Sequence, residues 1–239
     1  MNNIELENPK VVSREEWLTA RRELLAKEKA LTRQRDDLAR QRRELPWVKV
    51  DKAYTFEGPD GRVTLSDLFQ GRSQLIVYHF MLGPDWEAGC TGCSFISDHV
   101  DSARQHFEHH DISYATVSRA PWAKIAPYKK RMGWTFNWVS SFGSDFNYDY
   151  QASSTPEEMA KGEMFYNFAP YQIDHDTDEM HGTSVFYKDS KGDIYHTYSE
   201  YARGGEDFLT TYRYIDITPK GRMETSPMSW MKRHDEYGK

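Results

Sequence analysis

The pattern of apolar and polar positions divides the chain into a charged helical segment and a following segment with alternating strands and helices. Residues 13–45 contain neither Gly nor Pro and are rich in Ala, Leu, Glu, Arg and Lys, which predicts one long helix. Ser13 and Glu16 have the spacing of a capping box, and Pro46 stops the helix. Its apolar positions form a narrow stripe: Trp17, Leu24, Leu25, Leu31 and Leu38. Such a stripe indicates a helix on the surface of its own domain or against a second subunit.

From residue 54 onward, short apolar runs alternate with helical patterns. Residues 54–56 and 62–64 flank a Gly-Pro-Asp-Gly turn and predict a strand pair. Further strands are predicted at 74–80, 112–117, 183–187 and 193–198, and helices at 95–109, 123–132 and 206–214. This order predicts an α/β fold with a mixed central sheet and helices on both of its faces. Residues 147–178 lack a clear period and predict a long, partly irregular insertion.

Length and composition indicate one domain with appendages, because 239 residues with 38% hydrophobic side chains build one sizeable core. We expect a helical extension over 1–45, an α/β domain over 46–218 and a C-terminal tail over 219–239. The longest apolar run, residues 75–82, is far shorter than a membrane span, and the acidic N-terminus is unlike a signal peptide. No membrane association is therefore predicted.

The only two cysteines are Cys90 and Cys93, placed between a predicted strand and a predicted helix. This C-x-x-C spacing indicates a dithiol that switches between reduced and disulfide forms. A helix start supplies partial positive charge and free N–H groups, which stabilise a thiolate on the first sulfur. We predict that Cys90 attacks a disulfide or another electrophilic sulfur, and that Cys93 resolves the mixed disulfide.

The cysteine count and the net charge narrow the compartment and the partners. Two cysteines are too few for a secreted disulfide framework, so a reducing cytoplasm is expected. The net charge of −6 argues against nucleic acid. The predicted partners are a small thiol, disulfide or peroxide substrate and a cellular thiol reductant, and no cofactor is expected. A homodimer is predicted, with the N-terminal helix at its interface.

Several other residues near the motif are candidates for handling substrate or protons. His79 lies on the central predicted strand, where it faces the cysteines or, as the favoured interpretation, is a core histidine with satisfied hydrogen bonds. Asp85, Trp86 and Glu87 lie in the approach loop. The two acids would accept a proton during exchange, although solvated loop acids are the favoured account, since a nearby carboxylate would raise the pKa of Cys90.

The alternative function is a copper or zinc binding protein, because thiolate sulfur and imidazole nitrogen are ligands for both metals. Its ligands would be Cys90 and Cys93 with a histidine drawn from His79, His175 and His181. The region around the last two is more simply a solvated acidic loop, since residues 144–179 carry nine acids and one lysine. A non-catalytic binding scaffold is the third interpretation.

Aromatic residues crowd the stretch 122–150. They would line a pocket for a flat organic molecule or, as such clusters more often do, fill a core beneath long loops.

Residues 56–71, followed by an apolar strand and the cysteine motif, resemble the opening of thioredoxin-fold proteins of the peroxiredoxin and TlpA type. The whole chain resembles a bacterial family of thioredoxin-like proteins catalogued as domain of unknown function 899. The segments that carry this resemblance are 12–17, 45–48, 78–86, 117–121, 142–149 and 233–237. It implies a thioredoxin-like fold, and a fold alone does not determine an activity.

Departures from the better known relatives refine this interpretation. Peroxiredoxins carry P-x-x-x-T/S-x-x-C, whereas Pro84 precedes Cys90 by six positions and no hydroxyl lies between Glu87 and Cys90. A peroxidase of that type is therefore disfavoured. Thioredoxins hold substrate with a cis-proline, a position that corresponds here to Gly182 or Thr183. The favoured function is a thiol–disulfide oxidoreductase of the thioredoxin-like superfamily.

Overall fold

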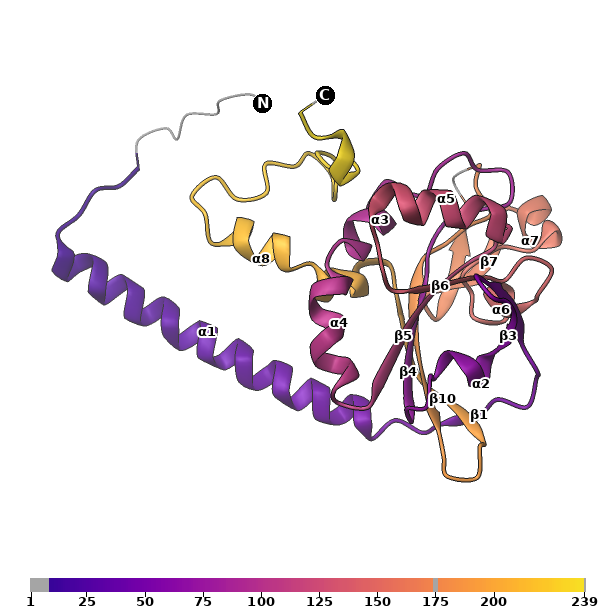
Figure 1. Cartoon of the computed structure of the whole chain (residues 1–239). Helices are drawn as coiled ribbons and strands as arrows, with labels where there is room; N and C mark the ends of the chain where they lie inside the picture. Colours follow the sequence, from indigo (N-terminus) through magenta and orange to yellow (C-terminus); the bar gives the residue numbers. More distant parts are fainter. Residues whose placement is uncertain (1–8, 174–175, 239) are drawn as a thin grey trace.

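The computed structural model describes residues 9–173 and 176–238. An eight-stranded sheet in the order β1-β10-β9-β4-β5-β6-β2-β3 forms the centre of the molecule (Figure 1). The strands of this sheet are β1 (Val48–Lys49), β2 (Thr55–Gly58), β3 (Gly61–Thr64), β4 (Gln74–His79), β5 (Ile112–Ser118), β6 (Asn137–Ser140), β9 (Gly182–Lys188) and β10 (Ile194–Tyr201). A separate hairpin consists of β7 (Glu163–Tyr166) and β8 (Ala169–Gln172).

The pairing directions identify the fold. β4, β5 and β6 run parallel, whereas β9 runs antiparallel to β4 and β10 antiparallel to β9. Two strand–helix crossovers followed by an antiparallel hairpin make the thioredoxin-like arrangement predicted from the sequence. β4 lies at the centre, between β5 and β9, which explains why its sequence is almost continuously apolar.

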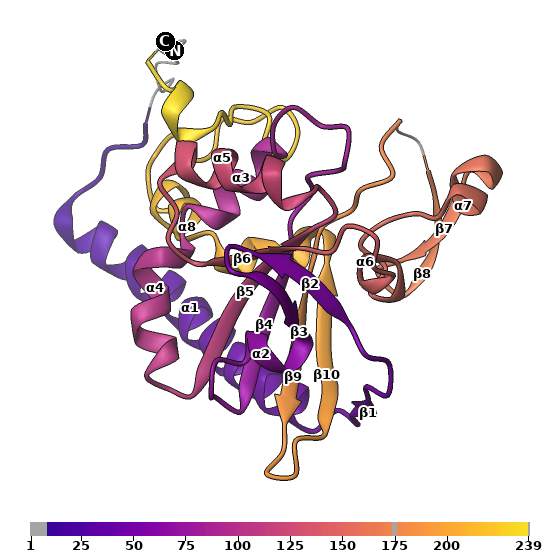
Figure 2. The ribbon, with the colours of Figure 1, turned by 45° about the vertical axis from the view of Figure 1, so that its right-hand side comes forward.

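Helices cover both faces of the sheet (Figure 2). On one face, α3 (Thr91–Ser97), α4 (Val100–Glu108), α5 (Trp122–Met132) and α8 (Thr210–Asp216) pack on a core that includes Tyr78 and Phe80. On the other face, α2 (Leu65–Leu68) and α6 (Phe146–Asp149) pack on Leu75 and Val77 of β4. Alternate residues of β4 therefore belong to opposite cores, and this alternation decides which side chains reach the cysteines.

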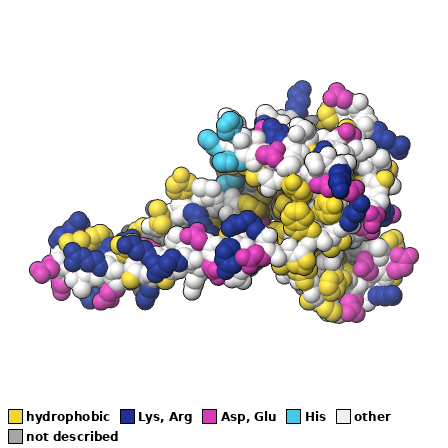
Figure 3. Space-filling view, turned by 90° about the horizontal axis from the view of Figure 1, so that it is seen from below, with side chains coloured by type: hydrophobic (Ala, Val, Ile, Leu, Met, Phe, Trp, Pro, Cys, Tyr) yellow, Lys and Arg dark blue, Asp and Glu magenta, His cyan; other side chains and the backbone are white. Residues whose placement is uncertain are grey.

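The N-terminal helix α1 (Arg14–Arg43) has the predicted capping box of Ser13 and Glu16. It has no buried residue and projects away from the body as an arm (Figures 1 and 3). Near its end, the guanidinium of Arg42 lies 5.4 Å from the ring centre of Tyr198. The expectation that α1 packs along its own domain is therefore wrong, and its apolar stripe stays exposed.

Two predicted helices are divided in the structure. The helix expected over 95–109 breaks into α3 and α4, because the ring Nδ1 of His99 bonds the carbonyl oxygen of Phe95 at 2.7 Å and competes for that helical acceptor. The closing helix consists of the 3₁₀ segment η1 (Ala202–Phe208) and then α8. The insertion holds α7 (Pro156–Lys161) and the β7–β8 hairpin, which the sequence pattern did not predict.

Residues 219–238, called here the C-terminal tail, return across α3 and α5 and end with the short 3₁₀ turn η2 (His234–Glu236). The Trp230 ring packs at 5.8 Å from Phe95 of α3 and at 6.4 Å from Tyr212 of α8. The tail thus forms part of the core on the face that carries the cysteines. Among the described residues, no helix combines the length and the apolar character needed to cross a bilayer.

Candidate active site

The C-x-x-C motif lies where the loop after β4 enters α3, and both cysteines are free thiols. Cys90 is the N-cap residue of α3, and its Sγ accepts the backbone N–H of Cys93 at 3.5 Å. Its own N–H donates to the carbonyl oxygen of Met81 at 3.0 Å, which fixes the end of the loop. Cys90 is partly exposed, whereas Cys93 is 2% exposed. The first sulfur is therefore the accessible one.

The surroundings of the two thiols shift their pKa values in opposite directions. A hydrogen bond from the Cys93 thiol, helped by backbone N–H groups of Cys93 and Gly92 and by the charge of Arg233, lowers the pKa of Cys90 to about 6. Burial, and then the proximity of Cys90, raise the pKa of Cys93 well above its usual range. At neutral pH Cys90 is thus a thiolate, and Cys93 is its protonated hydrogen-bond donor.

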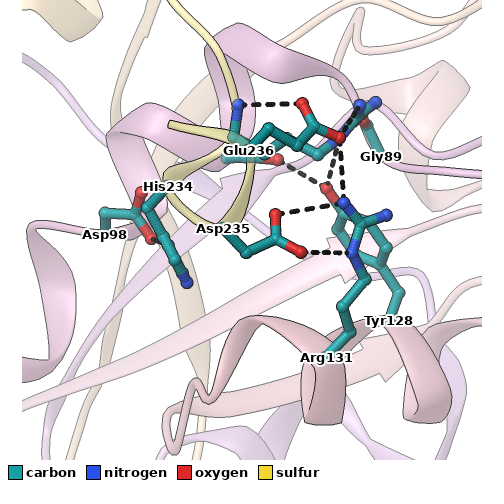
Figure 4. A network of polar contacts seen from close by, with 9 residues as sticks. Gly89, Asp98, Tyr128, Arg131, His234, Asp235 and Glu236 are labelled. Carbon is teal, nitrogen blue, oxygen red and sulfur yellow. Dashed lines mark hydrogen bonds and ion pairs between the residues drawn. The ribbon is translucent and has the colours of Figure 1, made fainter. Parts of the chain in front are cut away.

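A polar network holds the loop before Cys90 in place (Figure 4). The guanidinium of Arg233, from the tail, donates to the Gly89 carbonyl at 2.6 and 3.2 Å and to the Tyr128 hydroxyl at 2.9 Å. That hydroxyl shares a 2.8 Å hydrogen bond with Ser94, whose hydroxyl donates to the Cys90 carbonyl at 2.7 Å. Gly89 itself is required, because a Cβ there would lie 2.5 Å from the ring of Phe80. The tail therefore supports the geometry of the motif directly.

A cavity of about 250 Å³ opens beside the two sulfurs and is called here the Cys90 pocket. Its lining includes both cysteines, Tyr78 and Ile96 of the domain, and Pro227 and Met228 of the tail. The buried Tyr78 hydroxyl lies close to Cys93 and, as a hydrogen-bond donor, favours the ionised form of that thiol. This phenol is therefore available to the resolving sulfur.

His181 also lines the Cys90 pocket. Its Nε2 lies 3.1 Å from the Ala202 carbonyl oxygen, which only accepts, so the proton lies on Nε2 and the Nδ1 lone pair stays available. Burial lowers the pKa of His181. A neutral imidazole with a free acceptor nitrogen suits it to take up a proton beside the sulfurs.

His79 lies on the opposite face of β4 from the cysteines. It is fully buried between Phe146 and Tyr150, and its Nε2 is 2.9 Å from the Ser184 hydroxyl. Burial lowers the pKa of His79 to about 3, so it stays neutral. His79 is therefore a core residue, and its inclusion in a metal set with the cysteines is wrong.

The metal interpretation finds no further support in the described residues, where no group of three or more His, Cys, Asp and Glu side chains is arranged to hold a metal ion. His181 does share the pocket with both cysteines. His175 lies outside the described residues.

The approach loop does not line the Cys90 pocket. Asp85 and Glu87 are exposed, and Asp85 and Trp86 border a separate polar hollow of about 700 Å³ that also contacts Arg119. Thr183 is buried opposite Tyr78 in the sheet and lines a neighbouring apolar hollow. At Gly182 a Cβ would lie 2.4 Å from the Tyr201 ring, and the described chain contains no cis peptide bond. The Tyr201 ring therefore packs directly against the backbone of Gly182.

Most aromatic residues of the stretch 122–150 fill the interior. Trp134, Phe136 and Trp138 are buried in the core on the cysteine face, and Phe146 and Tyr150 in the core on the other face. The favoured interpretation of a core is therefore confirmed for these rings. Phe142 and Tyr148 line a separate hollow, and the expectation of an aromatic wall at the cysteines is wrong, because no aromatic residue of this stretch lines the Cys90 pocket.

The end of β5 carries a second buried polar cluster. Arg119 pairs through Nε with Glu179 Oε1 at 2.6 Å, and it also contacts Asp178 and the Tyr148 hydroxyl. Glu179 is fully buried, and burial raises its pKa to about 7 against the opposing effect of Arg119. This cluster ties the insertion to the sheet.

Residue patterns alone did not identify Tyr78, Ser94, Tyr128, Met228 or Arg233. They come from β4, α3, α5 and the C-terminal tail, so only folding brings them together. The available indication was the family resemblance at 233–237, which places a recurring segment far from the motif in sequence.

Comparison of the chain with known proteins finds one matching family and several similar solved structures. Residues 6–237 match the family described as "Bacterial protein of unknown function (DUF899)". No curated protein matches the chain.

Three solved structures give the range of structural similarity. A cysteine-to-serine variant of PrxQ from Xylella fastidiosa is 13% identical, covers 67% of this chain and 88% of its own, and has a TM-score of 0.43. A variant of peroxiredoxin Q from Xanthomonas campestris is 12% identical, with coverages of 67% and 90% and a TM-score of 0.44. Peroxidoxin BcpB from Mycobacterium tuberculosis is 14% identical, with coverages of 72% and 97% and a TM-score of 0.40.

Proposed function

We propose, from the premise that the chain belongs to the DUF899 family of bacterial proteins, that it is a thiol–disulfide oxidoreductase. Cys90 is the nucleophile and Cys93 the resolving thiol. The observation that carries this proposal is the pairing of an accessible, acidic Cys90 with a buried, weakly acidic Cys93 at the edge of a cavity.

In the first step, the Cys90 thiolate attacks one sulfur of a disulfide R–S–S–R. The S–S bond breaks, a Cys90–S–S–R mixed disulfide forms, and R–S⁻ leaves. Cys93 then loses its proton and attacks the Cys90 sulfur, which expels the second R–S⁻. The substrate gains two electrons and two protons, and a cellular thiol reductant restores the protein dithiol.

His181 and Tyr78 are placed to serve the second step. Cys93 must lose a proton although burial raises its pKa. The free Nδ1 of His181 is an acceptor for that proton, and the Tyr78 hydroxyl stabilises the resulting thiolate. Asp85, Trp86 and Glu87 have no part in this step because they lie outside the pocket.

Mass spectrometry across a graded series of thiol redox buffers tests the function. We expect a reversible loss of two hydrogen atoms confined to the peptide that contains Cys90 and Cys93, and none in the Cys90→Ser or Cys93→Ser variant. A pair that stays reduced under oxidising buffer contradicts the proposal. Purification without added metal, followed by metal analysis, distinguishes the alternative, since a metal protein would retain bound copper or zinc.

We also propose a reducing compartment, the cytoplasm, and a homodimer. A reducing compartment suits a pair that reacts only as a dithiol. The dimer follows from α1, whose stripe has a seven-residue spacing at Trp17, Leu24, Leu31 and Leu38 and is not covered by its own domain.

A further inference from the structure

We infer that the Cys90 pocket selects small, uncharged disulfides with apolar substituents, and that the C-terminal tail is the wall that excludes larger ones. This inference rests on the proposed function, because it names the substrate class of the same thiolate.

The size of the Cys90 pocket and the apolar character of its walls determine which class of substrate it binds. At about 250 Å³, it is smaller than the roughly 300–1,000 Å³ of ordinary small-molecule sites, so it accepts a group such as one ring or a short alkyl chain. Ile96, Ala202, Pro227 and Met228 present apolar atoms to it. Burying one apolar group against such walls increases binding by about tenfold or more.

The charged groups at the pocket bind one another. Arg203 Nε lies 2.6 Å from Glu206 Oε1, and Arg222 Nη1 lies 3.3 Å from the other oxygen of the same carboxylate. These pairs neutralise the charged side chains that line the pocket. A substrate with several carboxylates, such as glutathione disulfide, therefore finds no uncompensated cation among the described lining residues.

The tail lies directly over the motif. A Cβ built on Gly92 would lie 3.3 Å from Met228 Sδ and 3.8 Å from Cys90 Sγ, so the Met228 side chain reaches the immediate neighbourhood of the nucleophile. The hydrogen bonds of Arg233 to Gly89 hold this arrangement. With Met228 this close to the motif, we expect the docked tail to keep a protein disulfide from Cys90, whereas the Cys90 pocket admits a small molecule.

Methanethiosulfonate reagents of different charge test the substrate class. Each reagent forms Cys90–S–S–R and releases methanesulfinate. The reaction is therefore the same throughout the series, and only the R group that enters the pocket differs. We expect the benzyl reagent to modify Cys90 about tenfold faster than the cationic trimethylammonioethyl and anionic sulfonatoethyl reagents, after division by each reagent's rate with free cysteine thiolate. Equal corrected rates, or a faster charged reagent, overturn the inference.

A matched pair of tail variants tests the wall. Met228→Glu places a carboxylate at the pocket and is expected to slow the benzyl reagent about tenfold and to speed the cationic one. Met223→Glu adds the same charge at a tail position that is 49% exposed and does not line the pocket, and is expected to leave the rates unchanged. Circular dichroism verifies that both variants fold. Equal effects of the two substitutions show that the tail is not the wall.

The reagent series separates failure of this inference from failure of the proposed function. Fast modification that is the same for all reagents leaves an active thiolate and overturns only the substrate class. Modification no faster than that of the unfolded chain at the same pH overturns the function and this inference with it.

Discussion

At the scale of single residues, the reactivity of Cys90 depends on Cys93, a thiol that is itself unreactive while it stays protonated. Cys93 donates a hydrogen bond to the Cys90 sulfur only because burial keeps it protonated. The residue that resolves the reaction thus also prepares the nucleophile, and its hydrogen bond is lost once the mixed disulfide forms.

This dependence predicts the effect of removing the donor. Cys93→Ala is expected to raise the pKa of Cys90 from about 6 toward the value of a free cysteine, about 8.5. Because the thiolate fraction rises with pH through the pKa, the alkylation rate at neutral pH should fall about tenfold. The pH profile of alkylation measures this change.

Cys93→Ser provides the control, since its hydroxyl still donates a hydrogen bond. Its Cys90 pKa should lie between those of the wild type and Cys93→Ala. An unchanged profile in Cys93→Ala would show that the backbone N–H groups alone make Cys90 acidic.

At the scale of elements, α1 is the segment in which large apolar side chains are most clearly exposed to solvent. Trp17, Leu24 and Leu31 are 45%, 52% and 49% exposed, although such residues usually lie against a partner. An isolated helix of 30 residues draws little stability from its own sequence. The proposed contact with α1 of a second copy would account for the stripe.

Leu31→Lys is therefore expected to shift the protein from dimer to monomer in light scattering at a fixed concentration, because it places a charge in the stripe. Ala26→Lys carries the same charge on an exposed position away from the stripe and should remain dimeric. A monomeric wild-type protein, or a dimeric Leu31→Lys variant, would contradict the interface.

At the scale of the whole molecule, distant segments meet at two polar clusters. Arg233 of the tail joins the loop before α3, and Glu179, directly after the insertion, joins Arg119 at the end of β5. Each cluster fastens an appendage to the sheet, and only the first holds segments whose residues line the Cys90 pocket.

Glu179→Ala is expected to lower the free energy of unfolding by about 3 kcal/mol, because it leaves the buried Arg119 guanidinium with a weaker, half-exposed partner in Asp178. Chemical denaturation measures the loss. Cys90 alkylation should change little in the folded protein, since the cluster lies outside the pocket. A loss below 1 kcal/mol would show that water or Asp178 compensates the charge.

Local patterns predicted the central fold well. The apolar positions of β4, β5 and α5 recur with the spacing expected for strands and a helix that are buried in a core. The nucleophile could be predicted equally well, because the C-x-x-C spacing is visible in a short stretch of sequence. The pocket was not predictable from pattern, because Tyr78, His181 and Met228 are far apart in sequence and are individually ordinary. The side of the sheet that His79 faces depends on strand register, which a single sequence leaves open.

The fastening of the tail has a further consequence. Arg131 binds Asp235 and Glu236, both at 2.9 Å, and His234 binds Asp98 at 2.7 Å, with all of these side chains partly in solvent. Dissolved ions screen such pairs, whereas the apolar core beneath them is little affected. Concentrated salt therefore weakens these outer pairs, while Trp230 stays packed against Phe95 and Arg233 stays bonded to Gly89. We therefore expect the alkylation rate of Cys90 to change little with salt concentration, because the contacts that hold the tail over the motif lie beneath the screened pairs.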